Sequence, residues 1–441
     1  MRYRFDSLKA LRLASVSLLI VLFLTIGLCL AQNSVEQLLT KAMEYGAQGQ
    51  FIEAKQEIEK ALKVDPTHIN AKLVLGGIED VNTKRIAREA AIHFFKGKSY
   101  GKRGKLDEAI AEFNRALEIN PGFAVAYLSR GIAYGDKGNY DKAISDYNKA
   151  LEINPYDPIA YLGRGMSYES KGRVDQAFSD YNLALGLNPD FAEAYLNRGD
   201  AYGHFGQLDD AISDYNKAIE LKPEIAPIYV NRGFAYSRKG QYDQAISDYN
   251  KAIVLDPGIS QAYNNRGLAY SKKGQYGQAI SDYNEAIKLD PSYAKAYINR
   301  GLAYDKRGEY DKAISDFTTV IKIDPRNADA YFCRGNAYDN KGEYDRAISD
   351  FSTGIEINPR DADAYFSRGN VYGRNGQYAD AIFDYNNAID INPDFATAYN
   401  SRGVAHMRSG NGEKACSDWK HACQLGNCRN YTIAKGTGEC E

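Results

Sequence analysis

The chain has 441 residues, of which 44% are hydrophobic and 25% are charged, and its formal net charge at pH 7 is −2. This slightly acidic balance excludes a protein that binds nucleic acid through a basic face, because phosphate contacts require clustered cations. The five histidines are scattered without a metal-ligand spacing, and no nucleophile motif accompanies them, so we expect neither a metal nor another cofactor.

The first 31 residues form a segment of their own. Arg2, Arg4, Lys9 and Arg12 precede an almost wholly apolar run over residues 13–30, and small residues suited to cleavage end it. This layout is that of a secretory signal peptide. The apolar run is also nearly long enough to remain as an N-terminal membrane anchor. Both interpretations predict an exported bacterial protein of the periplasm or cell envelope.

Beyond this segment, proline recurs every 34 residues, at Pro121, Pro155, Pro189, Pro223, Pro257, Pro291, Pro325, Pro359 and Pro393. Gly131 and Ala143 recur with the same spacing. A fixed period of this length indicates a supersecondary unit copied many times, in which each copy contacts only its neighbours. We therefore expect the function to reside on a surface of the array rather than in a catalytic cleft, and we expect no enzyme.

Each copy reads as two helices, as the unit over residues 192–225 illustrates. The first helix carries an aromatic residue, a glycine and a second aromatic residue on one face: Tyr195, Gly199 and Tyr202. Gly206 interrupts this pattern, and apolar or small residues return at helical spacing from Ala211 onward. Pro223 ends the second helix, since proline cannot continue the backbone ladder. The unit is predicted to be an antiparallel helix pair.

A 34-residue helix pair with aromatic, glycine, tyrosine, alanine and proline at these offsets resembles the tetratricopeptide repeat family. The resemblance implies an all-α fold, a right-handed α-solenoid of stacked helix pairs. In its register the chain divides into a unit at 35–68, a segment at 69–89, nine contiguous units over 90–395, a terminal unit at 396–429 and a tail at 430–441. The segment at 69–89 matches a first helix without its second, and we expect a bend or a degenerate half-repeat there.

Each of the eleven units carries a cation at its seventh position and a carboxylate at its twenty-third. The pairs include Arg198 with Asp214, Arg232 with Asp248, Arg266 with Asp282, and in the first two units Lys41 with Glu57 and Lys96 with Glu112. Because arginine offers a fork that matches a carboxylate, we predict structural ion pairs between the two helices of a unit or between neighbouring units. The alternative is an arginine stripe that binds anions.

By the same resemblance, the first helices line a concave groove. Its sixth position is asparagine in four consecutive units: Asn197, Asn231, Asn265 and Asn299. Cations stand at the thirteenth position in three of these units: Arg238, Lys272 and Lys306. A side-chain amide offers a donor and an acceptor to a peptide backbone. We therefore predict a scaffold that binds protein or peptide segments with a preference for acidic side chains. The alternative is a structural or assembly component of an envelope or secretion complex that acts by self-association.

Four cysteines cluster near the C-terminus: Cys416, Cys423, Cys428 and Cys440. In an exported protein such a cluster indicates disulfides. Cys416 and Cys423 are seven residues apart on a predicted helix, a rise of about 10 Å, which is too far for a bridge between them. Two pairings remain, and each ties this helix to the tail. A zinc site that uses His421 is the rival interpretation.

Overall fold

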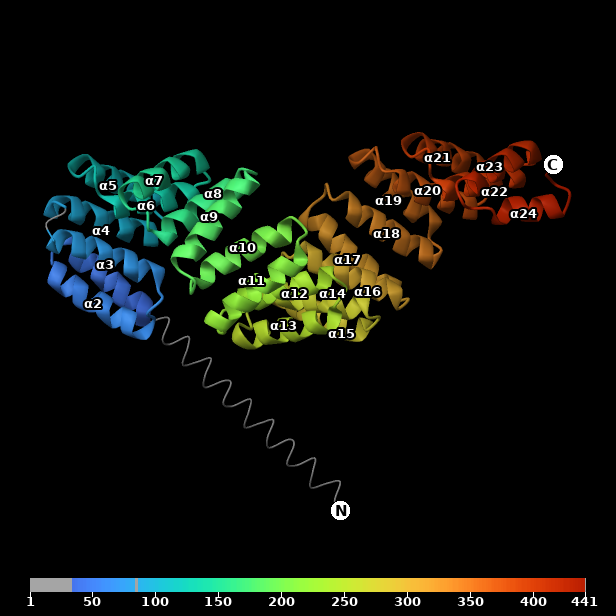
Figure 1. Ribbon diagram of the computed structural model, residues 1–441. Helices are drawn as coiled ribbons and strands as arrows, with labels where there is room; N and C mark the ends of the chain where they lie inside the picture. The colour runs from blue at the N-terminus through green and yellow to red at the C-terminus, as the bar shows by residue number, and fades with distance from the viewer. Residues whose placement is uncertain (1–33, 84–85, 441) are drawn as a thin grey trace, which may run out of the picture. The chain divides into compact units, whose positions relative to one another are not determined.

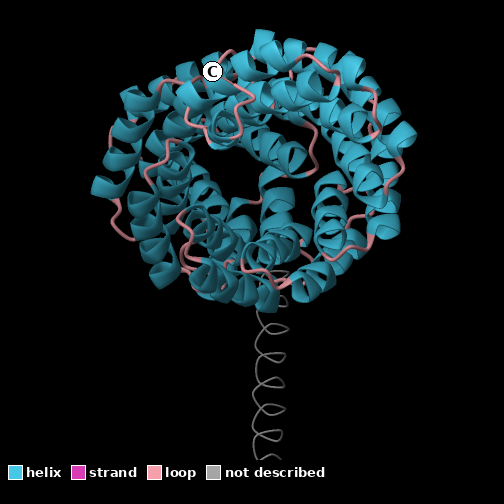
Figure 2. Cartoon of the chain, turned by 90° about the vertical axis from the view of Figure 1, so that its right-hand side faces the viewer, coloured by secondary structure: helices cyan, strands magenta, loops and turns pink. Residues whose placement is uncertain are grey.

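The computed structural model describes residues 34–83 and 86–440. The expected signal peptide or anchor at 1–31 lies outside these residues. Within them, all regular structure is helical, as Figure 2 shows, and the expected all-α architecture of paired helices is confirmed. In this part of the chain no helix has both the length and the apolar character that crossing a membrane requires.

The chain divides into two compact parts, Met1–Lys239 and Gly240–Glu441, called here the N-terminal part and the C-terminal part. The N-terminal part has a helix over residues 34–47, followed by α2 (Phe51–Val64), α3 (Ile69–Asn82), α4 (Arg88–Lys102), α5 (Leu106–Ile119), α6 (Ala124–Asp136), α7 (Tyr140–Ile153), α8 (Pro158–Ser170), α9 (Val174–Leu187), α10 (Ala192–His204), α11 (Leu208–Leu221) and α12 (Ala226–Arg238).

The C-terminal part contains α13 (Tyr242–Leu255), α14 (Ser260–Lys272), α15 (Tyr276–Leu289), α16 (Ala294–Lys306), α17 (Tyr310–Ile323), α18 (Ala328–Lys341), α19 (Tyr344–Ile357), α20 (Ala362–Arg374), α21 (Tyr378–Ile391), α22 (Ala396–Arg408), α23 (Gly412–Gln424) and α24 (Arg429–Gly436). Helices consecutive in the chain lie side by side within each part (Figure 1).

The turn inside a unit requires glycine. Between α14 and α15, Gly274 has φ +74°, a left-handed conformation that a residue with a Cβ adopts only at a cost. At the other end of α15, the Asp290 side chain accepts a hydrogen bond from the backbone N–H of Ser292 at 2.9 Å. Pro291 stands between these two residues and prevents the helix from continuing.

The two helices of a unit approach most closely at the glycine of the first helix. A Cβ added at Gly267 in α14 would lie 2.7 Å from a ring carbon of Tyr283 and 3.1 Å from the carbonyl oxygen of Ala279. Tyr283 itself is fully buried. Its cluster includes Ala303 from the next unit, so each second helix packs on its own first helix and on the one that follows. Stacking therefore buries the apolar faces that a single pair would leave exposed.

The segment at 69–89 contains a regular helix of normal length. α3 has 14 residues and buries Leu73, Val74 and Ile78. It contacts α2, α4 and also α6, a first helix of the repeat array. This part of the chain thus adds an extra helix beside the first helices of the units that follow it.

Candidate functional site

In eight of the repeats, an arginine of the first helix binds two neighbouring side chains at once. In α10, Arg198 donates from Nε to Asp214 Oδ2 and from Nη2 to Asp214 Oδ1, both at 2.7 Å. Its third nitrogen, Nη1, donates to Asn182 Oδ1 of the preceding unit at 2.6 Å. The guanidinium also lies over the ring of Tyr195, 5.6 Å from its centroid. We call this arrangement, an arginine fork on a carboxylate of its own unit with Nη1 on the preceding unit, the arginine clasp.

The same bidentate pairing of arginine with aspartate occurs in eight units. It joins Arg130 to Asp146, Arg164 to Asp180, Arg198 to Asp214, Arg266 to Asp282, Arg300 to Asp316, Arg334 to Asp350, Arg368 to Asp384 and Arg402 to Asp418. Arg232 belongs to the N-terminal part and Asp248 to the C-terminal part, so that pair stays a prediction.

The bond from Nη1 to the preceding unit was not expected from the sequence. Its acceptors, the twenty-fifth residues of their units, are Asn114, Asn148, Asn182, Asn216, Asn250, Asn284, Thr318, Ser352 and Asn386. The signal was present, because every acceptor stands 16 residues before its arginine, just as each partner aspartate stands 16 residues after it.

The two N-terminal units with lysine in place of arginine depart from the expected pairing. Among the described residues, Glu57 pairs with Lys60 at 2.5 Å, and Glu112 pairs with His93 at 2.7 Å and Arg115 at 2.6 Å. A lysine ammonium is a single point charge without the fork that holds a carboxylate in two places. The carboxylates therefore take partners other than the lysines of the seventh position.

Burial makes the arginine clasp a structural element. The Asp214 side chain is 8% exposed and that of Arg198 is 19% exposed. The hydrogen bond to Asp214 raises the pKa of Arg198, and burial of the guanidinium opposes this rise. Since Nε, Nη1 and Nη2 all donate within the chain, the geometry leaves the arginine column poorly suited to an external anion.

The groove asparagines of the N-terminal part donate hydrogen bonds to acceptors within the chain. Asn197 Nδ2 donates to the carbonyl of Glu193 at 2.7 Å, and Asn231 Nδ2 donates to Asp200 Oδ1 at 2.8 Å. Arg238 Nη1 likewise donates to the carbonyl of Gly203 at 2.6 Å. The preference for acidic segments was predicted from the cations of the groove alone. That prediction did not take into account that Arg238 is hydrogen-bonded within the chain, or that carboxylates also lie in this stretch of groove.

In the C-terminal part, the groove asparagines join a third amide that sequence reasoning missed. Asn299 Nδ2 donates to Asn264 Oδ1 at 2.9 Å, and Asn264 Nδ2 donates to Asn265 Oδ1 at 3.3 Å. Asn264 is only 1% exposed. The sequence feature that could have identified it is an asparagine at the fifth position of its unit, where other units have the apolar residues Leu196, Val230 and Ile298. The three amides form a short hydrogen-bonded chain from α16 to α14.

Apolar and cationic side chains stand exposed beside this amide chain. Leu268 on α14 is 38% exposed and Leu302 on α16 is 42% exposed. Lys272 and Lys306 follow four residues later on the same helix faces and are also exposed. Within the described residues, no ion pair engages either lysine. Since α14 and α16 contact each other, these four side chains share one surface.

Comparison with protein families settles which repeat this is. Family models described as tetratricopeptide repeat match residues 38–68, 124–157, 192–225, 226–258, 260–293, 294–327, 317–349 and 362–395. A model described as TPR repeat matches 97–138, 167–204 and 340–376. The chain belongs to the tetratricopeptide repeat family. Tetratricopeptide repeats are scaffolds for protein–protein interaction and are generally not enzymes.

Several solved structures are similar to this chain. MamA is 33% identical over 39% of this chain and 94% of its own, with a TM-score of 0.36. YrrB, described as a TPR protein with an unusual peptide-binding site, is 27% identical over 42% and 95%, also with a TM-score of 0.36. The APC/C Cut9–Hcn1 hetero-tetramer is 16% identical over 82% and 88%, with a TM-score of 0.46. No curated protein matches the sequence.

The last tetratricopeptide unit is closed by two disulfides. Cys416 bonds to Cys440, and Cys423 bonds to Cys428. This is one of the two pairings that the helix spacing allowed. The first bridge holds α24 against α23, where Trp419 packs. All four thiols are thereby used, and the described residues contain no cluster suited to a metal ion.

Proposed function

We propose that this chain is a non-enzymatic scaffold that holds protein or peptide segments in the groove along the first helices of its repeats. One observation carries the proposal: Leu268 and Leu302 stand exposed on adjoining helices, each with an exposed lysine one turn further along. An apolar surface beside cations suits a segment that presents apolar and acidic side chains together.

The amide chain supports an extended backbone in this groove. Asn264 lies between Asn265 and Asn299, so a donor group remains at the Asn265 end and a carbonyl oxygen at the Asn299 end. A peptide unit presents the complementary groups whatever its side chains are. Backbone contacts would give affinity, and the leucines and lysines beside them would give selectivity.

The N-terminal part of the groove offers a different chemistry. Asp200 accepts hydrogen bonds from Tyr215 and Asn231, and Glu169 accepts them from Tyr181 and approaches His204. Burial raises the pKa of Asp200, and its hydrogen bonds oppose that rise. We therefore assign the preference for acidic segments to the C-terminal part alone.

The test begins with selection of binders from a random peptide library against the whole protein. We expect enrichment of segments in which aspartate or glutamate stands near leucine or isoleucine. In the variant Lys272→Ala/Lys306→Ala, affinity for an enriched peptide should fall by about tenfold, the loss expected for two removed charge contacts. The matched control Lys251→Ala/Lys288→Ala removes two exposed lysines from the second helices and should leave affinity unchanged.

Two results would count against this function. Enrichment of basic segments would contradict the charge argument, and equal losses in the test and control variants would contradict the location. If no peptide binds while the protein forms larger oligomers as its concentration rises, self-association as an assembly component becomes the better account. Analytical ultracentrifugation of the whole chain distinguishes these cases.

We also propose that the protein works outside the cytoplasm, in the periplasm or cell envelope. An N-terminal segment that stays uncleaved would anchor it to the inner membrane there. The basic and apolar residues at 1–31 support export. The disulfides Cys416–Cys440 and Cys423–Cys428 suit an oxidising compartment. Cell fractionation with mass analysis of the mature N-terminus tests this, and a cytoplasmic protein with four reduced thiols in this region would refute it.

A further inference from the structure

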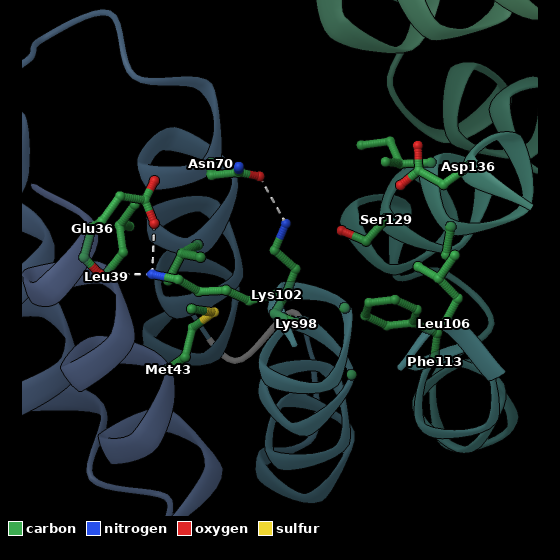
Figure 3. A pocket seen from close by; sticks show the side chains of 15 residues that line it. Glu36, Leu39, Met43, Asn70, Lys98, Lys102, Leu106, Phe113, Ser129 and Asp136 are labelled. Atoms are coloured by element: carbon green, nitrogen blue, oxygen red, sulfur yellow. Dashed lines mark hydrogen bonds and ion pairs between the residues drawn. The ribbon is translucent and has the colours of Figure 1, made fainter. Parts of the chain in front are cut away.

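The N-terminal part contains a cavity of about 210 Å³ where α3 lies beside the first helices of the repeats. Its walls come from the helix over residues 34–47 and from α3, α4, α5 and α6 (Figure 3). Apolar side chains make up much of the lining: Leu39, Met43, Val74, Leu106, Phe113 and Ile132. Since α3 lies in the segment that interrupts the 34-residue period, the cavity owes one wall to that interruption.

One of the two lysines at the cavity is fully occupied. Lys102 Nζ contacts Glu36 Oε2 at 2.6 Å, and it also donates to the carbonyl of Glu36 and to Thr40 Oγ1, both at 2.7 Å. Three acceptors satisfy the three hydrogens of an ammonium group. Lys102 therefore fastens the helix over residues 34–47 to α4 and belongs to the wall.

The other lysine has hydrogen-bonding capacity left over. Lys98 Nζ donates to Asn70 Oδ1 at 3.1 Å, which uses one of its three hydrogens. Asp136 lines the cavity from the end of α6, and within the described residues neither a hydrogen bond nor an ion pair engages its carboxylate. Burial lowers the pKa of Lys98 to about 8 and raises that of Asp136, and each group's attraction for the other opposes its shift. No ion pair joins Lys98 to Asp136, so both groups face the cavity with hydrogen-bonding capacity left over.

A buried hydroxyl points into the same space. Ser129 is only 4% exposed, and its Oγ has no hydrogen-bond partner. Figure 3 shows this oxygen directed toward the region between Lys98 and Asp136. Leaving a buried hydroxyl unsatisfied costs free energy, so the geometry marks a place where an absent molecule would complete the hydrogen bonds.

We propose that this cavity binds a free α-amino acid with an apolar side chain. Its carboxylate would accept hydrogen bonds from Lys98 and Ser129, and its ammonium would donate to Asp136. Its side chain would pack against Leu39 and Met43 and against Val74 of α3. This ligand site goes beyond the scaffold function proposed above and does not depend on it.

Charge and size together select this ligand class. A cavity whose unpaired charges are one cation, Lys98, and one anion, Asp136, is best matched by a molecule that carries both opposite charges. An unmatched charge is more costly at the half-buried Lys98 than at Asp136, which is exposed to solvent. The volume corresponds to that of about seven water molecules, which suits one amino acid rather than a peptide strand. A bound molecule would contact α3, α4 and α6 together and so would hold the inserted helix against the repeats.

The test measures binding to the whole protein by calorimetry with four groups of probes. Free leucine, methionine and phenylalanine carry both charges and an apolar side chain. Leucinamide lacks the carboxylate, N-acetyl-leucine lacks the ammonium, and the dipeptide Leu-Leu separates the two charges. We expect at least one of the free amino acids to bind saturably, and each of the three altered compounds to bind about tenfold more weakly or worse.

Variants on the protein side test the same contacts. Lys98→Met, Asp136→Asn and Ser129→Ala should each weaken amino-acid binding by about tenfold. Lys96→Met is the matched control, because Lys96 is an exposed lysine of the same helix, and it should leave binding unchanged. Hydrogen exchange in α3 should slow when the ligand binds, since the ligand contacts that helix.

Several outcomes would overturn the proposal. Absence of saturable binding by all three amino acids at millimolar concentration is one, and equal affinity for leucine and leucinamide is another. Unchanged binding in Lys98→Met would also refute it. If a variant fails to fold, the series of probes on the unaltered protein still decides the matter. Tight binding of Leu-Leu alone would instead indicate a peptide terminus as the occupant and would refute a free amino acid.

Discussion

Breaking one arginine clasp should loosen a single repeat together with its junction to the unit before it. In Asp214→Ala, the largely buried guanidinium of Arg198 loses both bonds of its fork and keeps only the bond to Asn182. Removing one partner of a buried pair costs about 3–5 kcal/mol. Because Arg198 is 19% exposed and retains one hydrogen bond, we expect a loss just below that range, about 2–3 kcal/mol.

The reverse change and the double change complete the cycle. Arg198→Met leaves the Asp214 carboxylate buried without its fork, and we again expect a loss of about 2–3 kcal/mol. Arg198→Met/Asp214→Ala combines the two changes and leaves no unpaired charge, so its loss should be no more than about 2 kcal/mol. The coupling energy between the two positions would then be at least about 2 kcal/mol.

Hydrogen exchange is the suitable assay, because a repeat array opens unit by unit and a global melting curve averages over all of them. Amides of α10 and α11 should lose protection by about 30–150-fold in each single variant. Asn182→Ala is the control: it removes only the bond between units and should cost about 1 kcal/mol. Strictly additive losses in the cycle would refute the pairing, and unchanged exchange in α10 and α11 would refute its energetic importance.

Three further predictions concern other features of the chain. Gly267→Ala places a Cβ 2.7 Å from a buried tyrosine ring and should cost about 1–3 kcal/mol, whereas Gly277→Ala meets nothing within 4 Å and should stabilise α15 by up to about 1 kcal/mol; denaturant unfolding compares the two, and equal effects would contradict the packing. The pKa of Lys98 is about 8 in the folded chain against 10.5 ordinarily, so the unfolded chain holds more protons between these values and stability rises with pH across that window. Lys98→Met should therefore be more stable than the unaltered protein near pH 7, by of order 1–3 kcal/mol, and that advantage should shrink by pH 10.5; a constant difference would contradict it. Replacing Cys416 and Cys440 by serine opens a bridge that spans 24 residues, and the loss of about 3 kcal/mol should appear as faster exchange in α24, with α14 as the internal control that stays unchanged.

The repeat register could be predicted because each unit restates it. Pro223 and its copies gave the boundaries, and Gly199 with Tyr195 and Tyr202 gave the face of the first helix that packs. The structure adds Tyr215 as the residue that Gly199 meets on the second helix. The spacing of Arg198 and Asp214 likewise appeared as two columns that change together. These features repeat, and repetition separates a packing requirement from chance.

Features that occur once in the chain, or that join a unit to the unit before it, could not be predicted from the repeat pattern. The bond to Asn182 joins residues of different units, and a search within one unit could not find it. The cavity depends on α3, for which the chain offers no second copy to compare. Asn264 interrupts an apolar column, and only the fold shows that its amide joins two neighbouring asparagines. The choice between two disulfide pairings required the course of the tail after Gly426.

The arginine clasp makes the internal repeats interchangeable modules. An internal unit with arginine at its seventh position donates one Nη1 hydrogen bond to the unit before it and offers one small polar acceptor to the unit after it, so a block of 34 residues can be removed or inserted with these joints still matched. In the terminal unit, the acceptor position holds Lys420 instead, and a lysine cannot accept a bond from arginine. A further copy joined there would meet a repelling charge. The same position that keeps inserted internal repeats compatible with their neighbours therefore disfavours the docking of a further repeat on the terminal unit.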